Sequence, residues 1–467
     1  MRSKTTLTRR NFLAGTAGGL AGFTIIPRLV LGENGQPSAN NKLNIAGIGV
    51  GGMGKSNLDA VCAVEDKENG GKAGPSENIV ALCDVDQSYA ESVYKRYPQA
   101  KTFKDYRVML DKMGRQIDAV IIATPDHTHA VIAAECMKRG KHVYVQKPLT
   151  RTVYEARKLT EAARQYKVIT QMGNQGHSGD SIRMLCEWIW DGAIGPVREV
   201  HAWTNRPVWP QGLSRPMDAP PVPETLDWDL WLGPAPYRPY NPAYHPWIWR
   251  AWRDFGTGAL GDMACHILDP VFWALKLKYP TSVQGSYAAN VVGRGKKIDL
   301  SESYPLGSAI HYEFPAREDM PPVKLHWYDG GLLPERPAEL EVERKMGDEN
   351  GGVIFIGDKG VLMCGSYGEG PRLIPETKMQ EYKRPEKTIS RISTSHEMHW
   401  VESCKNGVQT TCNFDYAGPF TETVVMGNLA LFYPGQKLLW DGENMKVTNI
   451  VEANEYVNPP YRQGWSL

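Results

Sequence analysis

The segment LNIAGIGVGGMGKSNLDAV, residues 43–61, constrains the fold of this chain more than any other part of the sequence. A short apolar run is followed by closely spaced glycines and then by residues that suit a helix. Gly49, Gly51 and Gly54 have the spacing that gives a tight turn, a close backbone approach to a pyrophosphate and a close helix–strand contact. A second register that starts at Gly47 also fits, so the register stays open. The pattern predicts a strand–turn–helix unit whose helix amino terminus binds phosphate.

Further apolar runs continue this alternation of strand and helix. Residues 78–83 and the near-continuous apolar run 117–123 are predicted strands, and a helix over about 127–139 leads to a strand at 142–145. This spacing predicts a doubly wound parallel sheet, in which ligands bind at the carboxyl ends of the strands. The residues found at or near those ends are Asp84, Thr124, Pro125, His129, Gln146 and Lys147.

Asp84 lies where a carboxylate accepts hydrogen bonds from both ribose hydroxyls of a dinucleotide and repels a 2′-phosphate, so we expect NAD rather than NADP. Its distance from Gly54 is longer than usual, and we assign the excess to a loop over residues 65–77. The alternative role for Asp84 is to cap the next helix. The residues expected to bind the cofactor are Gly49, Gly51, Gly52, Met53, Gly54, Asp84, Thr124, Pro125, His129, Gln146 and Lys147.

The second half of the chain has a different pattern. After about residue 282, three segments alternate as antiparallel strands do, and residues 421–433 are predicted to form a late helix. We therefore predict an α/β chain in which a doubly wound parallel-sheet domain, residues 41–172, precedes an α+β domain, residues 173–467. The second domain would contain a large, mostly antiparallel open sheet.

The amino terminus resembles a twin-arginine export signal. Arg9 and Arg10 precede Asn11, Phe12 and Leu13 and then an uncharged, glycine-rich run. We expect residues 1–40 to be signal and linker, so that the protein is exported or periplasmic and the export machinery is a partner. A basic disordered tail is the alternative, and an uncleaved signal would anchor the chain to the membrane.

Composition excludes several other classes of protein. The chain carries 53 Lys and Arg against 52 Asp and Glu, a formal net charge of +1, which gives no electrostatic case for a nucleic-acid partner. The eight cysteines never form a Cys-x-x-Cys pair, so we expect buried thiols and neither a metal site nor a disulfide framework.

The segment GTGALGDMACHILD contains Asp262 and His266, four residues apart. On one helix face, Asp262 or Asp269 would orient the imidazole of His266, which is the natural base for a hydroxyl proton. The alternative is a surface contact between neighbouring side chains. Lys147 would approach from the first domain and stabilise the developing alkoxide.

A proline-rich passage, residues 208–246, lies in a tryptophan-rich region, since ten of the fourteen tryptophans fall between Trp188 and Trp273. Tryptophan faces stack on sugar rings, although we expect more than half of these side chains only to bury the loop. His245 and Arg250 are further candidates for contacts with sugar hydroxyls. The residues expected to bind substrate are His177, Tyr244, Trp249, Arg253, Asp262 and His266.

Taken together and in this order, the motifs resemble the Gfo/Idh/MocA oxidoreductase family. The matching segments are the glycines at 49–54, Asp84, TPDHTH at 124–129, QKP at 146–148 and DMACHILD at 262–269. Asp126 and Gln146 depart from the family pattern, which has asparagine and glutamate there. The second departure removes a negative charge beside Lys147.

The resemblance implies an oxidoreductase that acts on a sugar or glycoside hydroxyl with a tightly bound NAD, as in glucose–fructose oxidoreductase, and a homo-oligomer. A cofactor held that tightly could travel with a folded, exported enzyme. Some relatives are glycosidases that oxidise, eliminate, hydrate and reduce with no net redox change, and this alternative stays open. A catalytically silent sugar-binding protein is the third alternative.

Overall fold

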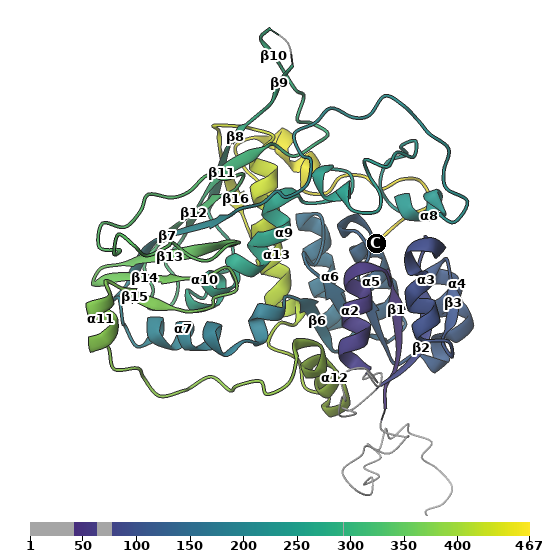
Figure 1. Cartoon of the computed structure of the whole chain (residues 1–467), viewed down its shortest axis with the longest axis horizontal. Coiled ribbons are helices and arrows are strands. Elements are labelled where there is room, and N and C mark those ends of the chain that lie inside the picture. The colour runs from purple at the N-terminus through teal and green to yellow at the C-terminus, as the bar shows by residue number, and fades with distance from the viewer. Residues whose placement is uncertain (1–41, 63–76, 293) are drawn as a thin grey trace, which may run out of the picture. The chain divides into compact units, whose positions relative to one another are not determined.

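The computed structural model describes residues 42–62, 77–292 and 294–467, which contain two large sheets flanked by helices (Figure 1). The predicted export signal at residues 1–40 and nearly all of the predicted loop at 65–77 lie outside the described residues. No helix within the described ranges is long and apolar enough to cross a membrane.

The first sheet has six parallel strands in the order β3-β2-β1-β4-β5-β6, which confirms the predicted doubly wound sheet. Its strands are β1 (Asn44–Ile48), β2 (Asn78–Cys83), β3 (Lys101–Phe103), β4 (Ala119–Ile122), β5 (His142–Gln146) and β6 (Thr170–Gly173). The connecting helices are α2 (Gly52–Val61), α3 (Gln87–Arg96), α4 (Tyr106–Met113), α5 (Asp126–Lys138) and α6 (Val153–Tyr166), with a 3-10 turn η3 (Gly114–Gln116). The strand order reverses between β1 and β4, where such sheets bind their ligands.

Local sequence explains these elements. All four residues of β4 are buried, as expected of a central strand covered by helices on both faces. Thr152 and Glu155 form a reciprocal capping box that starts α6. The cap of α3 is Asp86, whose carboxylate accepts from the backbone N–H of Ser88 and Tyr89. The capping role considered for Asp84 therefore belongs to Asp86, two residues later.

The second sheet has nine strands in the order β15-β14-β13-β7-β12-β11-β8-β16-β17. The only parallel pair within it is β7 with β12, so the sheet is mostly antiparallel, as predicted. Its strands are β7 (Val197–Thr204), β8 (Ser282–Ala288), β11 (Gly307–Phe314), β12 (Val323–Tyr328), β13 (Gly351–Gly357), β14 (Gly360–Cys364), β15 (Arg372–Ile374), β16 (Lys437–Asp441) and β17 (Lys446–Val447). A short hairpin, β9 (Val291–Val292) with β10 (Lys296–Lys297), stands apart from it.

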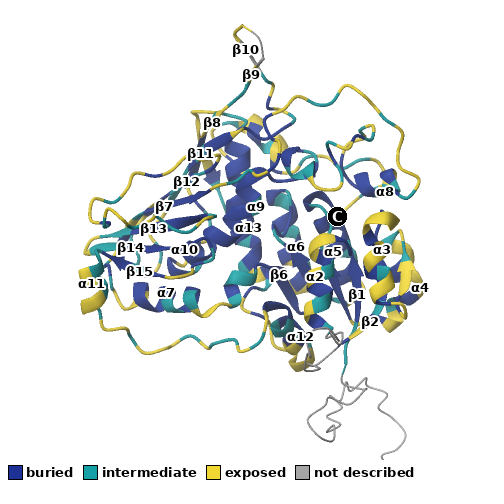
Figure 2. Ribbon diagram, in the orientation of Figure 1, coloured by how far each residue is buried: buried dark blue, intermediate teal, exposed yellow. Residues whose placement is uncertain are grey.

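Helices α9 (Gly258–Ile267) and α13 (Phe414–Ala430) lie between the two sheets (Figure 1). The longest, α13 (Phe414–Ala430), packs against both α6 and α9 and is almost wholly buried (Figure 2). The other helices are α7 (Asp180–Trp190), α8 (Trp228–Leu232), α9 (Gly258–Ile267), α10 (Asp269–Ala274), α11 (Glu376–Glu381) and α12 (His396–Asn406). The remaining 3-10 turns are η4 (Gln175–Ser178), η5 (Ile248–Ala251) and η6 (Val451–Tyr456).

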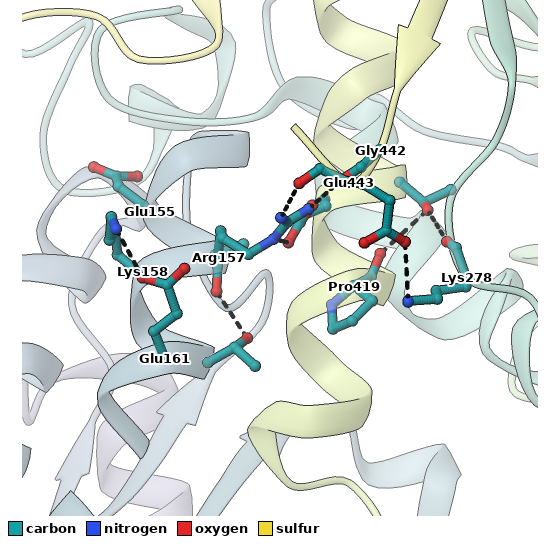
Figure 3. A network of polar contacts seen from close by, with 12 residues as sticks. Glu155, Arg157, Lys158, Glu161, Lys278, Pro419, Gly442 and Glu443 are labelled. Atoms are coloured by element: carbon teal, nitrogen blue, oxygen red, sulfur yellow. Dashed lines mark hydrogen bonds and ion pairs between the residues drawn. The ribbon is translucent and has the colours of Figure 1, made fainter. Parts of the chain in front are cut away.

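A polar network joins α6 to the second half of the chain (Figure 3). Arg157 donates Nε and Nη2 to the two carboxylate oxygens of Glu422, each at 2.8 Å, and Nη2 also donates to the carbonyl of Gly442 at 2.8 Å. Glu422 is fully buried, so this bidentate pairing satisfies a charge that would otherwise be costly there. The network ties α6, which covers the first sheet, to α13 and to the turn after β16.

Two predicted helices have different limits in the structure. The late helix predicted at 421–433 begins earlier, at Phe414, and contains Pro419. The helix predicted to present Asp262, His266 and Asp269 on one face is two helices, α9 and α10, with Pro270 in the first turn of the second. Proline lacks the N–H that would continue the first helix, so Asp269 leaves the face that carries His266.

Candidate functional site

The glycine turn between β1 and α2 has the geometry of a phosphate-binding loop. Gly49 adopts a φ of +74°, and a Cβ there would lie 2.7 Å from the backbone nitrogen of Thr124. A Cβ at Gly54 would lie 2.0 Å from the carbonyl oxygen of Gly49, so this glycine allows the close packing of the helix. At Gly47 the nearest atoms belong only to flexible side chains. The register is therefore the one that starts at Gly49.

Asp84 holds the glycine loop from the end of β2. Its Oδ2 accepts from the backbone N–H of Val50 at 2.9 Å and of Gly51 at 3.3 Å, and its Oδ1 accepts from that of Asp86 at 3.0 Å. Burial raises the pKa of the Asp84 carboxyl, and the three backbone donors offset part of that increase. The carboxylate also lines the cavity, where it can meet a ribose.

One cavity of about 420 Å³ runs from the glycine loop to α9. Every predicted cofactor contact lines it except Gly54 and His129. His129 lies behind the wall, where its two ring nitrogens face the carbonyl oxygens of Pro148, at 2.9 Å, and Thr124, at 2.8 Å. It therefore holds the loops after β4 and β5 rather than contacting a ligand. Gln146 lines the cavity and donates Nε2 to Asn57 Oδ1 at 2.9 Å.

The reactive side chains meet at the end of this cavity beside α9. Lys147 donates Nζ to the carbonyl oxygen of Asp262 at 2.7 Å and to its Oδ1 at 3.0 Å. His266 also lines the cavity, and its Nδ1 lies 2.9 Å from Asn174 Oδ1. The ring of Tyr367 lies against the imidazole, with the two ring centres 4.7 Å apart. The predicted catalytic residues Lys147, Asp262 and His266 are thus brought together.

The residue that orients His266 differs from the prediction. Neither Asp262 nor Asp269 hydrogen-bonds the imidazole; the amide oxygen of Asn174 does so. Burial lowers the pKa of His266 well below its usual range, and nearby Lys147 lowers it further. The imidazole is therefore neutral near pH 7, and donation from Nδ1 to Asn174 leaves Nε2 as the acceptor.

Asp262 is engaged by cations instead. Burial alone would raise its pKa, but Lys147 and Arg250 bring the pKa below its usual range. Its carboxylate lies 3.0 Å from Lys147 Nζ, 3.5 Å from Arg250 Nε and 3.7 Å from Arg206 Nε. Asp262 thus positions Lys147 at the cavity and stays ionised.

Three predicted substrate contacts lie outside the cavity. His177 is buried, pairs with Asp269 Oδ1 at 3.0 Å and stacks on Trp273, so it ties η4 to α10. Tyr244 is buried among aromatic rings. Arg253 is buried with its guanidinium over Phe432, and its Nε donates to the carbonyl of Leu300 at 2.8 Å. The structure therefore places these three predicted residues outside the cavity, where each has a packing role.

The tryptophan-rich passage both packs and lines the cavity. Trp228 and Trp252 do not reach the cavity; they are buried in an aromatic cluster behind three of the tryptophans that line it. The cavity is lined by Trp209, Trp231, Trp247 and Trp249. Trp249 is the predicted substrate contact that the structure places at the cavity, together with Asp262 and His266.

Sequence reasoning missed several cavity residues and also Asn174, which hydrogen-bonds His266 but does not line the cavity. Asn174 and Tyr367 follow β6 and β14, and no motif marks them. Trp465 comes from the C-terminal segment and lines the end of the cavity that also contains Asp105 and Tyr106. For Asn174, the position directly after the last parallel strand was an available signal, because ligand-binding residues gather at such ends.

Comparisons with known proteins agree with this architecture. Residues 43–174 match the NAD-binding Rossmann fold of the Gfo/Idh/MocA oxidoreductase family, and residues 198–292 match the C-terminal alpha/beta domain of the same family. The glycine loop, the amino terminus of α2 and Asp84 fit the cofactor that this family model implies.

Among curated proteins, levoglucosan dehydrogenase of Pseudarthrobacter phenanthrenivorans is 26% identical over 227 residues, which are 49% of this chain and 50% of that enzyme. A glycosyl hydrolase family 109 protein of Shewanella putrefaciens is 30% identical over 159 residues, 32% of each chain. The chain thus spans about a third to a half of the length of these curated relatives.

Solved structures show the same fold over most of the chain. The WlbA dehydrogenase of Bordetella pertussis, in complex with NADH and UDP-GlcNAcA, has a TM-score of 0.58 and 14% identity. The match covers 86% of this chain and 99% of that one. GenD2 from gentamicin A biosynthesis, in complex with NAD, has a TM-score of 0.55 and 20% identity, covering 86% and 97%.

Proposed function

Because the chain carries both domains of the Gfo/Idh/MocA oxidoreductase family, we propose that it is an NAD-dependent oxidoreductase that acts on a sugar or glycoside hydroxyl. One observation carries the proposal: Lys147, Asp262 and His266 line the far end of the same cavity that begins at the glycine loop. Relatives named for sugar chemistry, including levoglucosan and inositol dehydrogenases, support the substrate class.

The side chains divide the chemistry between them. Neutral His266 accepts the hydroxyl proton at Nε2, while Asn174 fixes the imidazole through Nδ1. Lys147, held by Asp262, donates to the reacting oxygen and stabilises its developing negative charge. NAD, when bound, supplies the acceptor for the hydride that leaves the same carbon.

Tight retention of NAD is part of the proposal, and the walls of the cavity support it. On the side opposite the glycine loop, the walls come from the passage between Arg206 and Gly258 and from Trp465. The ring of Tyr89 packs over the loop itself, since a Cβ at Gly51 would lie 2.1 Å from it. A dinucleotide held among these segments would leave only after they move, which favours slow release.

A redox-neutral glycosidase is the second candidate. It is favoured by the similarity to the family 109 protein and by the ring of Tyr367 against His266, which offers a second group for proton transfer. A panel of p-nitrophenyl glycosides, added without cofactor or electron acceptor, separates the two. Repeated release of nitrophenol indicates the glycosidase, whereas reduction of bound nucleotide that stops after one turnover indicates the oxidoreductase.

We also propose that the protein is exported already loaded with NAD, on the basis of Arg9 and Arg10. Replacing both arginines with lysine should retain the protein in the cytoplasm. Cell fractionation checks this result, and unchanged export would contradict it.

A further inference from the structure

The reaction end of the cavity carries more positive than negative charge. Lys147, Arg206 and Arg250 line it together with two carboxylates, Asp262 and Asp126. Asp126 is buried and accepts from Thr257 Oγ1 at 2.6 Å, and burial raises its pKa. Asp262 is the carboxylate that lies within 4 Å of all three cations.

Arg206 is the cation that this arrangement neutralises least. It follows β7, and its Nη1 donates to the amide oxygens of Asn205 and of Asn350, which are both neutral. Its nearest carboxylate oxygen, Asp262 Oδ2, lies 3.7 Å from Nε and belongs to a group already paired with Lys147. Among the described residues, Nη2 has no hydrogen-bond partner, and the side chain is 21% exposed.

Arg250 adds a further positive charge beside Asp262, 3.5 Å from Oδ1, whereas Arg206 approaches Oδ2. Its guanidinium lies over the rings of Trp247 and Trp249, at 4.3 and 4.1 Å from their centres. These contacts hold the charge in place without neutralising it. A neutral sugar would bring no charge to either guanidinium, whereas a carboxylate would pair with the planar fork of Arg206 through two parallel hydrogen bonds.

The geometry points to a substrate that carries a carboxylate, a uronic acid or its glycoside, with Arg206 as the residue that selects it. This inference rests on the proposed function and specifies its substrate class. The acid group binds beside the reacting carbon and takes no part in proton or hydride transfer. Its effect should therefore fall mainly on KM rather than on kcat.

The test compares matched glycosides on the purified protein with its bound nucleotide. p-Nitrophenyl glucuronide and galacturonide are each paired with the neutral parent glycoside and with the uronide methyl ester, which keeps the bulk and removes the charge. Nucleotide reduction and nitrophenol release are both recorded. The free acid should exceed its neutral partners in kcat/KM by at least about tenfold.

Variants then assign the preference to Arg206. R206Q should lower kcat/KM for the acid by about 10- to 100-fold and leave the neutral glycosides within about threefold of wild type. R206K, which keeps the charge and loses the fork, should restore part of the preference. R198Q is the matched control on β7, because Arg198 is exposed and pairs with Asp358 away from the cavity. R198Q should leave kcat/KM unchanged for both the acidic and the neutral glycosides.

Several results would overturn the inference. One is an equal kcat/KM for the neutral and the acidic glycosides. Another is an equal decrease in kcat/KM for both classes in R206Q. Either result leaves the oxidoreductase proposal standing. If no glycoside reacts, the proposed function fails instead. Binding is then compared through the quenching of tryptophan fluorescence by glucuronate and by glucose, since Trp247 and Trp249 line the cavity. Stronger quenching by glucuronate would support the preference for a charged substrate. Equal quenching by the two sugars would overturn the inference.

Discussion

Replacing Asp84 with asparagine should relax the choice between NAD and NADP. The carboxylate lines the cavity and is held by three backbone N–H groups, so its position is fixed. A unit charge about 5 Å from a 2′-phosphate, at an effective dielectric of about 20, contributes roughly 3 kcal/mol of repulsion per unit of phosphate charge. Removing it should improve NADP binding relative to NAD by on the order of 100-fold.

The same substitution carries a structural cost that can be estimated. An asparagine side chain has one acceptor oxygen, which can keep the contacts with Val50 and Gly51, while its NH₂ group then faces the N–H of Asp86. Leaving that donor without an acceptor costs about 1–3 kcal/mol, and loss of a buried charge offsets part of it. NAD affinity should therefore fall by less than about tenfold.

The assay is titration of nucleotide-stripped protein with NAD and NADP at pH 8, because burial raises the pKa of Asp84 and a higher pH favours its carboxylate form. D118N is the matched control, because Asp118 precedes β4 at the opposite end of the same sheet and accepts from the backbone N–H of Asn44 at 2.8 Å. A ratio of NAD to NADP affinity that is the same in D84N as in wild type would refute the assigned role of Asp84.

Three further predictions concern the site and the core. Because the pKa of His266 lies well below the usual 6.5, its imidazole stays neutral as the pH falls through 6.5, and kcat/KM should not decrease there. N174D places a carboxylate beside the imidazole and should move the acidic decrease in kcat/KM to higher pH. A wild-type enzyme whose kcat/KM already decreases at pH 6.5 would contradict this. W465A removes a wall of the cavity and should speed the release of bound NAD by about 10- to 100-fold in a dilution experiment, whereas W190A, outside the cavity, should not. The Arg391 guanidinium, helped by the backbone N–H groups of Thr388 and Ile389, lowers the pKa of Glu187 from 4.5 to about 2. The stabilisation from these contacts is therefore present above pH 4.5 and is lost as the pH falls toward 2. R391Q should therefore lower the free energy of unfolding, measured with urea, by about 2–3 kcal/mol at pH 7 and by less at pH 3. A decrease that is the same at both pH values would show that the ionised form of Glu187 is not what Arg391 stabilises.

Strands and the glycine loop could be predicted because their signals are local. The buried run of β4 and the glycines of the turn depend on neighbours a few residues away. The late helix was also predicted from the sequence, but with a start at residue 421, two positions after Pro419. In the structure Pro419 is an interior residue of α13, and tertiary packing on both sides overrides its local cost.

Side chains far apart in the sequence explain the errors in the site. Lys147 and Asp262 are 115 positions apart, and the family resemblance, not periodicity, brought them together. Asn174 reaches His266 across 92 positions, and no spacing rule connects them. His177 and Arg253 are polar residues near functional motifs, but their partners, Asp269 and the carbonyl of Leu300, bury them. Burial of a polar side chain depends on its partners, which the sequence does not pair.

The most direct test of the account is a single turnover on the purified protein, with no nucleotide added. Mixing with the glycoside panel should raise the absorbance at about 340 nm as bound nucleotide is reduced, up to one equivalent per chain. K147M should retain the nucleotide, detected after acid denaturation, and give no rise. A K147M protein that reduces its nucleotide at the wild-type rate would contradict the central claim that Lys147 and His266 form the catalytic site.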